Sequence, residues 1–353
     1  MLSASWESVL TALADGADFN SSSASWVMGE VMQGRATDAQ TAGLLIGLAM
    51  KSPTTEEVIG LRNAALQYAG PVTIGPDAVD IVGTGGDPYG VTNISSVAAV
   101  IVAAAGVPVI KHGNRAASSV SGASDLLGTL GVDVMASAKQ IEDTFTHEGI
   151  AYLHAASFHP GFRHAAQVRE ELGVPTIFNL LGPLCNPARP NATAIGISAN
   201  QPLDIAAGVF QRRGATALVY RDELGIDKLT TIGGNQVVEI FNGEQRLHEI
   251  DPRDLGLPKG NLSDILGGSP VENATVARKI FDGGDHPTRD TILLNASAAV
   301  VAYELSRDSE QSRIPILDRF AMAYLRLSEV VSSGQAKNKL DRWRRRLAPD
   351  FAE

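Results

Sequence analysis

Short apolar segments alternate with longer helical ones from residue 78 to residue 222, and no other feature of the chain constrains its fold as strongly. The runs AVDIV (78–82), VPVI (107–110) and IAYLHA (150–155) have the length and content of buried strands, while NISSVAAVIVAAAG (93–106) has the pattern of a helix. Because strands that alternate with helices form a largely parallel sheet covered on both faces, we expect an α/β fold.

The first 70 residues lack this alternation and are typical of a helical domain. Thr37 and Gln40 have the spacing of a capping box before an apolar helical segment, and so do Thr54 and Glu57. The pair Gly70-Pro71 then ends the helical block. We therefore expect a small helical domain at 1–70.

The larger domain is expected to cover 75–353. Its segment 229–250 contains two strand-like runs around Asn242-Gly243, a pair that favours a hairpin turn, and the chain is mostly helical from about residue 263. The sequence thus predicts a small N-terminal helical domain followed by a larger α/β domain with a mostly parallel central sheet.

The composition excludes several classes of protein. The 353 residues are 44% apolar and 19% charged, and the single Cys185 excludes an intrachain disulfide, which fits a reducing, cytoplasmic compartment. The N-terminus has no signal-peptide pattern, and the longest apolar stretch, 98–110, is too short to span a bilayer. The formal net charge of −10 argues against nucleic acid as a partner, and we interpret the basic tail from residue 337 as the solvated face of a last helix.

A glycine-rich turn, GTGGD (83–87), connects the first expected strand to the first expected helix of the α/β domain. Glycines at such a turn let backbone N–H groups approach an anion, and the helix N-terminus adds a favourable dipole. The spacing matches neither a Walker A loop nor the dinucleotide fingerprint, and a plain tight turn stays possible. Asn93, Ser95 and Ser96 begin the helix and are candidates both for helix caps and for ligand contacts.

A second polar segment, KHGNRAASSVSG (111–122), directly follows the expected strand at 107–110. Loops at the carboxyl ends of parallel strands are where α/β sheets bind ligands. Cationic side chains, hydroxyls and free backbone N–H groups suit phosphate oxygens. The candidates in this segment are Lys111, His112, Asn114, Arg115, Ser118, Ser119 and Ser121.

The third segment, 157–188, combines histidines and arginines. His159 and His164 have no cysteine or glutamate at zinc spacing, so we expect no zinc site. The segment carries Arg163 and Arg169, and an arginine on a helix that faces a cleft can bind a carboxylate with two hydrogen bonds. Asn179 and Gly182-Pro183 predict a non-helical element near the same cleft.

Four motifs, in this order, resemble the anthranilate phosphoribosyltransferase family: GTGGD with NISS, KHGNRAASSVSG, FHPGFRHAAQVREELG and NLLGPLCNPA. The resemblance extends over most of the chain and is densest in 80–190. It implies the fold class of the pyrimidine nucleoside phosphorylases, with the active site at the hinge between the two domains and a segment near 170–187 joined to the helical domain. It also implies a homodimer formed through the helical domain.

The implied reaction moves the phosphoribosyl group of phosphoribosyl pyrophosphate to the amine of anthranilate, the second step of tryptophan biosynthesis from chorismate, with Mg²⁺ as cofactor. Pyrophosphate leaves the ribose C1 through an oxocarbenium-like transition state, so stabilisation of the leaving group and positioning of the weak amine nucleophile matter most. We therefore expect no side chain to act as a clear catalytic acid or base.

The resemblance also implies the site residues. Those for phosphoribosyl pyrophosphate are Gly83, Gly86, Asp87, Val91, Asn93, Ile94, Ser95, Ser96, Lys111, His112, Gly113, Asn114, Arg115, Ala116, Ala117, Ser118, Ser119 and Ala123. Those for anthranilate are Gly83, His112, Asn114, Arg169 and Pro183. The magnesium positions are Ser95, Asp227 and Lys228.

Three positions depart from the family pattern. Val91 stands where the family usually has Thr, and Ala123 stands where it often has Ser. The third is Lys228, which replaces the Glu of an Asp-Glu pair that holds magnesium ions, and an ammonium has no lone pair to offer a metal.

Two hypotheses follow for Lys228. Its ammonium neutralises pyrophosphate directly with fewer metal ions bound, or Asp222 or Glu223 supplies the missing carboxylate from the same loop. Either would weaken the magnesium dependence or lower the turnover. The alternative functions are a paralogue with another acceptor, a nucleoside phosphorylase, and a non-catalytic binding protein of the same fold.

Overall fold

The structure, a computed structural model, describes residues 5–115 and 120–348. Its N-terminal part consists of four helices, α1 (Trp6–Ala14), α2 (Ser21–Met32), α3 (Asp38–Lys51) and α4 (Thr55–Gln67). Both predicted capping boxes are present: Thr37 and Thr54 accept hydrogen bonds from the backbone N–H groups of Gln40 and Glu57. These short polar caps begin α3 and α4 where the sequence predicts.

The α/β part contains a seven-stranded sheet in the order β3-β2-β1-β4-β5-β6-β7. The strands are β1 (Val79–Gly83), β2 (Val109–Gly113), β3 (Ile150–His154), β4 (Ala192–Gly196), β5 (Thr216–Asp222), β6 (Asn235–Phe241) and β7 (Glu244–Ile250). The first five are parallel and the last two antiparallel, which confirms a mostly parallel sheet. The chain order reverses between β1 and β4, and ligands of such sheets bind at that reversal.

The predicted hairpin is formed by β6 and β7. Asn242 and Gly243 both have positive φ angles, 49° and 77°, as the two central residues of a type I′ turn require. The turn therefore sets the register of the two antiparallel strands, with Phe241 opposite Glu244.

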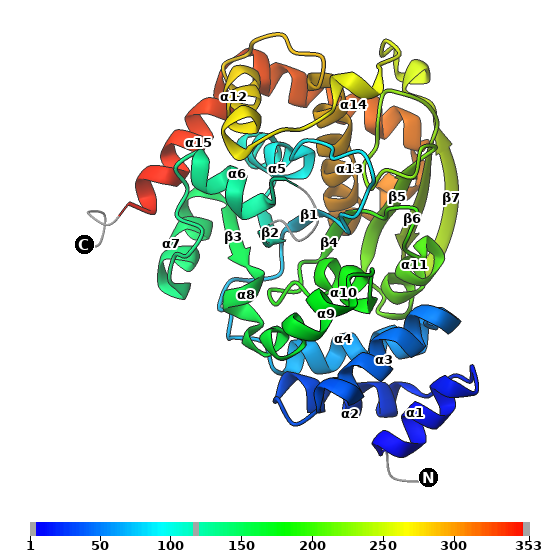
Figure 1. The fold of residues 1–353 in the computed structure, drawn as a ribbon. Coiled ribbons are helices and arrows are strands. Elements are labelled where there is room, and N and C mark those ends of the chain that lie inside the picture. The colour runs from blue at the N-terminus through cyan, green and yellow to red at the C-terminus, as the bar shows by residue number, and fades with distance from the viewer. Residues whose placement is uncertain (1–4, 116–119, 349–353) are drawn as a thin grey trace.

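Helices cover both faces of the sheet (Figure 1). Alternate residues of one strand enter different cores: Ile81 packs with α5 and α13, while Val82 packs with residues of α4, α10 and α11. The helices of this part are α5 (Ile94–Ala104), α6 (Ala123–Thr129), α7 (Ala138–Glu148), α8 (Ala155–Phe158), α9 (Ala166–Leu172), α10 (Ile177–Leu184), α11 (Leu203–Arg212), α12 (Pro270–Phe281), α13 (Arg289–Arg307), α14 (Ile316–Ser332) and α15 (Gln335–Arg346).

Helices α9 and α10 lie between the N-terminal helices and the sheet (Figure 1). Helix α9 contacts α3, and α10 contacts α3, α4 and β2. The segment expected near 170–187 thus packs against the helical domain and the end of a strand at the same time.

The prediction of a non-helical element at Asn179 and Gly182-Pro183 is wrong, because these residues belong to α10. Ile177, Leu181 and Leu184 are spaced as one face of a helix and are all buried, and this apolar stripe outweighs the break signal. Pro183 is the penultimate residue of α10, so its missing N–H affects only the last turn.

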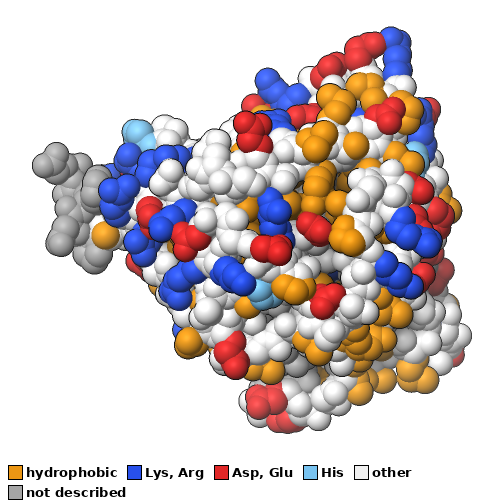
Figure 2. All heavy atoms as spheres, turned by 90° about the horizontal axis from the view of Figure 1, so that it is seen from above, with side chains coloured by type: hydrophobic (Ala, Val, Ile, Leu, Met, Phe, Trp, Pro, Cys, Tyr) orange, Lys and Arg blue, Asp and Glu red, His pale blue; other side chains and the backbone are white. Residues whose placement is uncertain are grey.

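The basic tail forms α15 and carries a mixture of charges rather than a free cationic patch. Arg342 pairs with Glu148 at 2.9 Å, and Arg346 pairs with Asp143 at 3.0 Å. Figure 2 shows Lys and Arg side chains interspersed with Asp and Glu near the C-terminal end of the molecule. The opposite face of α15, with Leu340 and Trp343, is buried. Among the described residues, no helix is long and apolar enough to cross a membrane.

Candidate active site

The ends of β1 and β4 must be glycine because the turn after β5 packs directly on them. A Cβ atom on Gly83 would lie 2.2 Å from Oδ2 of Asp227, and one on Gly196 would lie 1.8 Å from the carbonyl oxygen of Asp227. The two glycines face each other in the β1–β4 ladder. Beyond them, Gly85 has a φ of 65° and donates its N–H to Oδ2 of Asp227 at 2.7 Å. The glycine turn is thus fixed against Asp227.

The remainder of the glycine turn is held by hydrogen bonds with residues that follow β4 and with its own loop. Thr84 Oγ1 accepts the N–H of Ser198 at 2.9 Å, and the Asn200 amide donates to the carbonyl of Gly86 at 3.1 Å. Asp87 Oδ1 accepts two backbone N–H groups of its own loop, those of residues 89 and 90, at 2.9 and 3.1 Å. The turn is therefore held by hydrogen bonds from its own loop and from the segments after β4 and β5.

Asn93 occupies the cap position of α5 but does not cap the helix. Its side chain instead donates to the carbonyl of Ser121 at 2.8 Å and accepts from the Ser121 hydroxyl and the Asn273 amide, each at 2.9 Å. Among the described residues, the buried hydroxyl of Ser95 has no hydrogen-bond partner. An unpartnered buried oxygen at a helix N-terminus is suited to a ligand group or a metal ion.

Lys111 and His112 are neighbours on β2, and the pleat sends them to opposite faces of the sheet. The buried ammonium of Lys111 donates to the carbonyl of Ile81 at 2.7 Å and lies beside Asp80. Burial raises the pKa of Asp80 to about 6 and lowers the pKa of Lys111 to about 8, while their mutual attraction opposes both shifts. Asn186 holds Asp80 in place with a hydrogen bond of 2.9 Å.

His112, on the other face, begins a series of ring contacts. Its Nδ1 is 3.1 Å from the carbonyl of Gly182, and its ring meets that of His159 edge to face at 5.3 Å. Burial lowers the pKa of His112 to about 3, so the ring is neutral at physiological pH. Among the described residues, its buried Nε2 has no partner.

The series continues through Phe162 and Phe178 to Arg169. Phe162 stacks on His159 at 4.8 Å and meets Phe178 edge to face at 5.2 Å, and the guanidinium of Arg169 lies 5.1 Å above the Phe178 ring. We call these five residues, His112, His159, Phe162, Phe178 and Arg169, the aromatic ladder. No carboxylate within the described ranges pairs with Arg169, and burial lowers the pKa of Arg169.

The residues at the implied magnesium positions fit a metal ion unequally. The unpartnered hydroxyl of Ser95 fits one, with substrate oxygens as further ligands. The pair at 227–228 does not: Asp227 Oδ1 is 2.6 Å from Nζ of Lys228, and Asp227 Oδ2 accepts from Gly85. Across residues 5–115 and 120–348, no group of three or more His, Cys, Asp or Glu side chains could hold a metal.

The carboxylates of Asp222 and Glu223 are hydrogen-bonded within the connection from β5 to β6. Asp222 accepts the N–H of Ile226 at 2.7 Å and the hydroxyl of Thr230 at 3.0 Å, both within its own loop. Glu223 accepts the N–H of Gly234 at 3.2 Å. Both side chains shape the connection from β5 to β6, so the structure does not support the hypothesis that they supply a metal ligand.

Known proteins are similar to this chain over nearly its whole length. A model described as "Glycosyl transferase family, helical bundle domain" matches residues 7–69, and "Glycosyl transferase family, a/b domain" matches residues 75–337. The anthranilate phosphoribosyltransferase of Leifsonia xyli is 49% identical over 96% of this chain and 97% of the relative. The one of Nocardia farcinica is 43% identical over 95% and 97%. The chain belongs to the anthranilate phosphoribosyltransferase family.

Solved structures of the family have the same fold. The anthranilate phosphoribosyltransferase of Thermus thermophilus has a TM-score of 0.86 at 37% identity and covers 96% of this chain and 98% of its own. The Saccharomyces cerevisiae enzyme, in complex with PRPP and Mg, has a TM-score of 0.85 at 24% identity and covers 98% of both chains. As a member of this family the chain is a transferase, and its helical and α/β domains are those of its relatives.

The site residues expected for an anthranilate phosphoribosyltransferase lie in several parts of the structure. Gly83, Gly86, Asp87, Asn93, Ser95, Ser96, Lys111, His112, Gly113, Asp227 and Lys228 lie around the carboxyl ends of β1, β2 and β5 and the start of α5. Asn114 and Arg115 are exposed on the loop after β2, while Arg169 and Pro183 lie on α9 and α10. Ala116, Ala117, Ser118 and Ser119 lie outside the described residues.

Three expected contacts have side chains engaged in packing. Ile94 is completely buried in the core, so only its backbone can reach a ligand. Val91 packs against the same core and forms a bridge with Leu266. Ala123 lies close to Gly113, because a Cβ atom on that glycine would be 3.1 Å from the Cβ of Ala123.

Several residues that hold the site were not predicted from the sequence. Asp80 sits inside a strand-like run, and Asn273 is 180 positions from its partner Asn93, so neither gives a local signal. Asn186 does belong to one of the four motifs, NLLGPLCNPA, and that membership could have pointed to it. Ser198 and Asn200 have no such signal.

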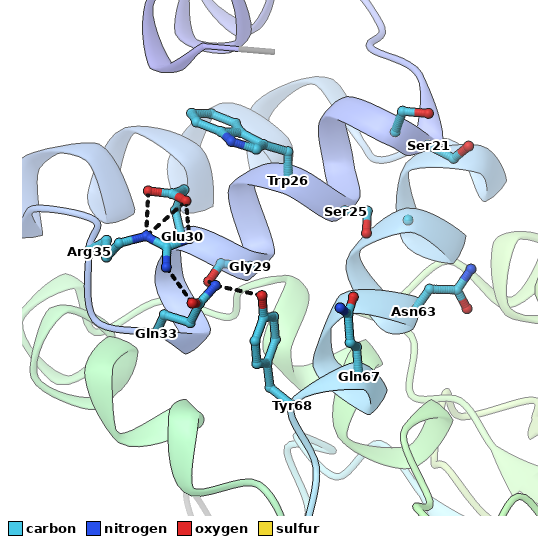
Figure 3. A pocket seen from close by; sticks show the side chains of 12 residues that line it. Ser21, Ser25, Trp26, Gly29, Glu30, Gln33, Arg35, Asn63, Gln67 and Tyr68 are labelled. Carbon is cyan, nitrogen blue, oxygen red and sulfur yellow. Dashed lines mark hydrogen bonds and ion pairs between the residues drawn. The ribbon is translucent and has the colours of Figure 1, made fainter. Parts of the chain in front are cut away.

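A separate pocket of about 560 Å³ lies in the helical domain, lined by side chains of α2 and α4 and the residues after them. In this pocket the Gln33 amide donates to the Tyr68 hydroxyl at 2.5 Å. Figure 3 shows this pair with Arg35 and Glu30, which form an ion pair, beside it. None of the expected site residues lines this pocket. It is therefore distinct from the region where the sheet ends and the aromatic ladder packs.

Proposed function

We propose that this chain transfers the phosphoribosyl group of phosphoribosyl pyrophosphate to the amine of anthranilate, yielding N-(5-phosphoribosyl)anthranilate and pyrophosphate in tryptophan biosynthesis. The observation that carries this assignment is the divergence of two neighbours on β2. Lys111 points toward Asp80 and the turn at 227–228, while His112 begins the aromatic ladder on the other face. One strand therefore serves a site for a polyanion and a site for an aromatic acid.

The polyanion site, which we call the donor half, holds phosphoribosyl pyrophosphate. It consists of the glycine turn, the N-terminus of α5 and the ammonium groups of Lys111 and Lys228. Charge builds on pyrophosphate as it leaves the ribose C1, and fixed N–H donors and cations stabilise that charge without reorganisation. When bound at Ser95, magnesium supplies further neutralisation of the same charge.

The aromatic ladder forms the acceptor half. Arg169 has no carboxylate partner among the described residues, so its guanidinium is available for the carboxylate of anthranilate. As the resemblance to the family implies, the neutral ring of His112 and the residue Pro183 would line the path from Arg169 toward the donor half. Since the amine of anthranilate is a weak nucleophile, holding it at C1 provides the main acceleration, and no acid or base is required.

We extend the proposal to cofactor, assembly and domains. The magnesium of the yeast enzyme, together with the unpartnered hydroxyl of Ser95, supports the use of Mg²⁺.

The domains that we propose are a helical unit, formed by residues 1–70 together with the segment 170–187, and an α/β unit at 75–353. The chain works in the cytoplasm as a homodimer joined through the helical domain, where Met50 of α3 is 83% exposed and available to a second copy. Sedimentation of the purified protein tests the dimer.

A fluorescence assay tests the reaction. The chain is expected to consume anthranilate only when phosphoribosyl pyrophosphate is present, and faster with magnesium than with a chelator. Phosphate-dependent cleavage of a pyrimidine nucleoside and a gel shift with DNA serve as controls, and we expect neither. If anthranilate is unchanged while another amine is consumed, the chain is a paralogue with a different acceptor, the alternative that Lys228 raises.

A further inference from the structure

Lys228 is a buried lysine placed at the glycine turn of the donor half. Its Nζ would be 2.8 Å from a Cβ atom on Gly83, so the ammonium lies directly against the end of β1. The residue is only 9% exposed. Burying an ammonium is costly unless it has a partner, so this position requires a specific electrostatic reason.

Asp227 supplies only part of that reason. Lys228 donates to Oδ1 of Asp227 at 2.6 Å and to its carbonyl at 2.9 Å, which uses two of the three N–H donors of the ammonium. The side chain retains 11% exposure, against 1% for Asp227. The ammonium therefore keeps one donor and an opening toward the space beside the glycine turn.

The charges around this position balance before any ligand arrives. Lys111 and Lys228 carry two positive charges, and Asp80 and Asp227 carry two negative ones, and all four residues are buried. Asp227 is engaged by Gly85 and Lys228, so it cannot turn both oxygens toward a metal ion. A divalent ion at this position would also be repelled by the adjacent ammonium.

We propose that the ammonium of Lys228 is a built-in counter-cation for pyrophosphate and takes the place of a metal ion at the 227–228 turn. The site then binds one divalent ion fewer than it would with a carboxylate at 228, with the remaining ion beside Ser95. Because the lysine is covalently attached and already positioned, it neutralises the leaving group without ion uptake. This inference rests on the proposed function.

The test counts metal ions in the presence of phosphoribosyl pyrophosphate, with Mn²⁺ as a paramagnetic probe for magnesium. Wild type is expected to bind one Mn²⁺ fewer per chain than Lys228→Glu, in which the ammonium is replaced by a carboxylate. Lys139→Glu, an equal charge change at an exposed position on α7, is expected to keep the wild-type count. Melting curves of each variant establish that it is folded.

A second variant keeps the test decisive if Lys228→Glu does not fold. Lys228→Met removes the charge but retains most of the length, and its affinity for inorganic pyrophosphate, measured by calorimetry, is expected to fall about tenfold, the effect of one charge-assisted hydrogen bond. Equal Mn²⁺ counts in wild type and Lys228→Glu, or unchanged pyrophosphate affinity in Lys228→Met, would overturn the inference. If wild type takes up no phosphoribosyl pyrophosphate at all, the proposed function fails as well.

Discussion

The donor half and the acceptor half meet at β2 but are built on different principles. In the donor half, polar atoms are held by other polar atoms: Asp80 by Asn186, Asn93 by Asn273, and Asp227 by Gly85. In the acceptor half, aromatic rings pack against one another. Burial lowers the pKa values of His112 and His159, so both rings are neutral. The donor half is thus constructed for charge, and the acceptor half for the shape of a flat ring.

This difference determines where each half is vulnerable. A network of hydrogen bonds and ion pairs tolerates little displacement, since one misplaced partner leaves another unpaired. A stack of aromatic rings tolerates larger displacements. Its recognition of a charged ligand, however, depends on the guanidinium of Arg169. Changes in the donor half should therefore be the more damaging, and each should leave binding of the other substrate nearly intact.

The largest effect is expected for Gly83→Ala. The new methyl group would collide with Asp227 Oδ2 and approach Lys228 Nζ, at 2.2 and 2.8 Å, and would displace the donor network. Overpacking of this kind costs about 3 kcal/mol, so kcat/KM for phosphoribosyl pyrophosphate should fall about 100-fold. Gly75→Ala is the control, because nothing lies within 4 Å of its Cβ position. A loss smaller than threefold at Gly83 would show that the donor half is more adaptable than proposed.

Removal of the charge in the acceptor half should have the next largest effect. Arg169→Met retains contact with Phe178 but loses the guanidinium, and KM for anthranilate should rise about tenfold or more, the worth of a charge-assisted hydrogen bond. The dissociation constant of phosphoribosyl pyrophosphate should stay within about twofold, since Arg169 is not part of the donor network. Arg163→Met, at a neighbouring exposed arginine, is the control. Equal weakening of both substrates would contradict a division of the site into two halves.

The smallest effect concerns pH and stability. Burial holds the pKa of His112 at about 3 in the folded protein, while an unfolded histidine has a pKa of about 6.5. As the pH falls below 6.5, protons bind the unfolded chain but not the folded one, so the stability contributed by the neutral ring is lost progressively down to pH 3.

From pH 7 to pH 5.5 this loss amounts to about 1 kcal/mol in the free energy of unfolding. Urea denaturation of wild type at the two pH values should show this decrease in the free energy of unfolding. In His112→Gln the decrease should be smaller by about 1 kcal/mol. An identical pH dependence in wild type and His112→Gln would mean that the ring of His112 accepts a proton in the folded state.

The sequence predicted the features that depend on neighbours in the chain. Capping at Thr37 and Thr54 and the turn at Asn242-Gly243 each need only a few adjacent residues, and all three are present. The error at Gly182-Pro183 arose because a local break signal was given more weight than the buried stripe of α10. The donor network was not predictable in detail, since the contact between Asn93 and Asn273 and the burial of Asp80 exist only once distant segments pack together.

The alternation of Lys111 and His112 along β2 has a consequence for how this enzyme can change. A shift of β2 by one residue against β1 would turn each of these side chains to the other face of the sheet, with the imidazole on the face of Asp80 and the ammonium on the face of the rings. Insertions and deletions in the 107–110 stretch would therefore impair both substrates at once, whereas point substitutions can tune either substrate alone. Substitution of single side chains around an unshifted β2 can therefore change recognition of the acceptor while the face toward Asp80 stays as it is.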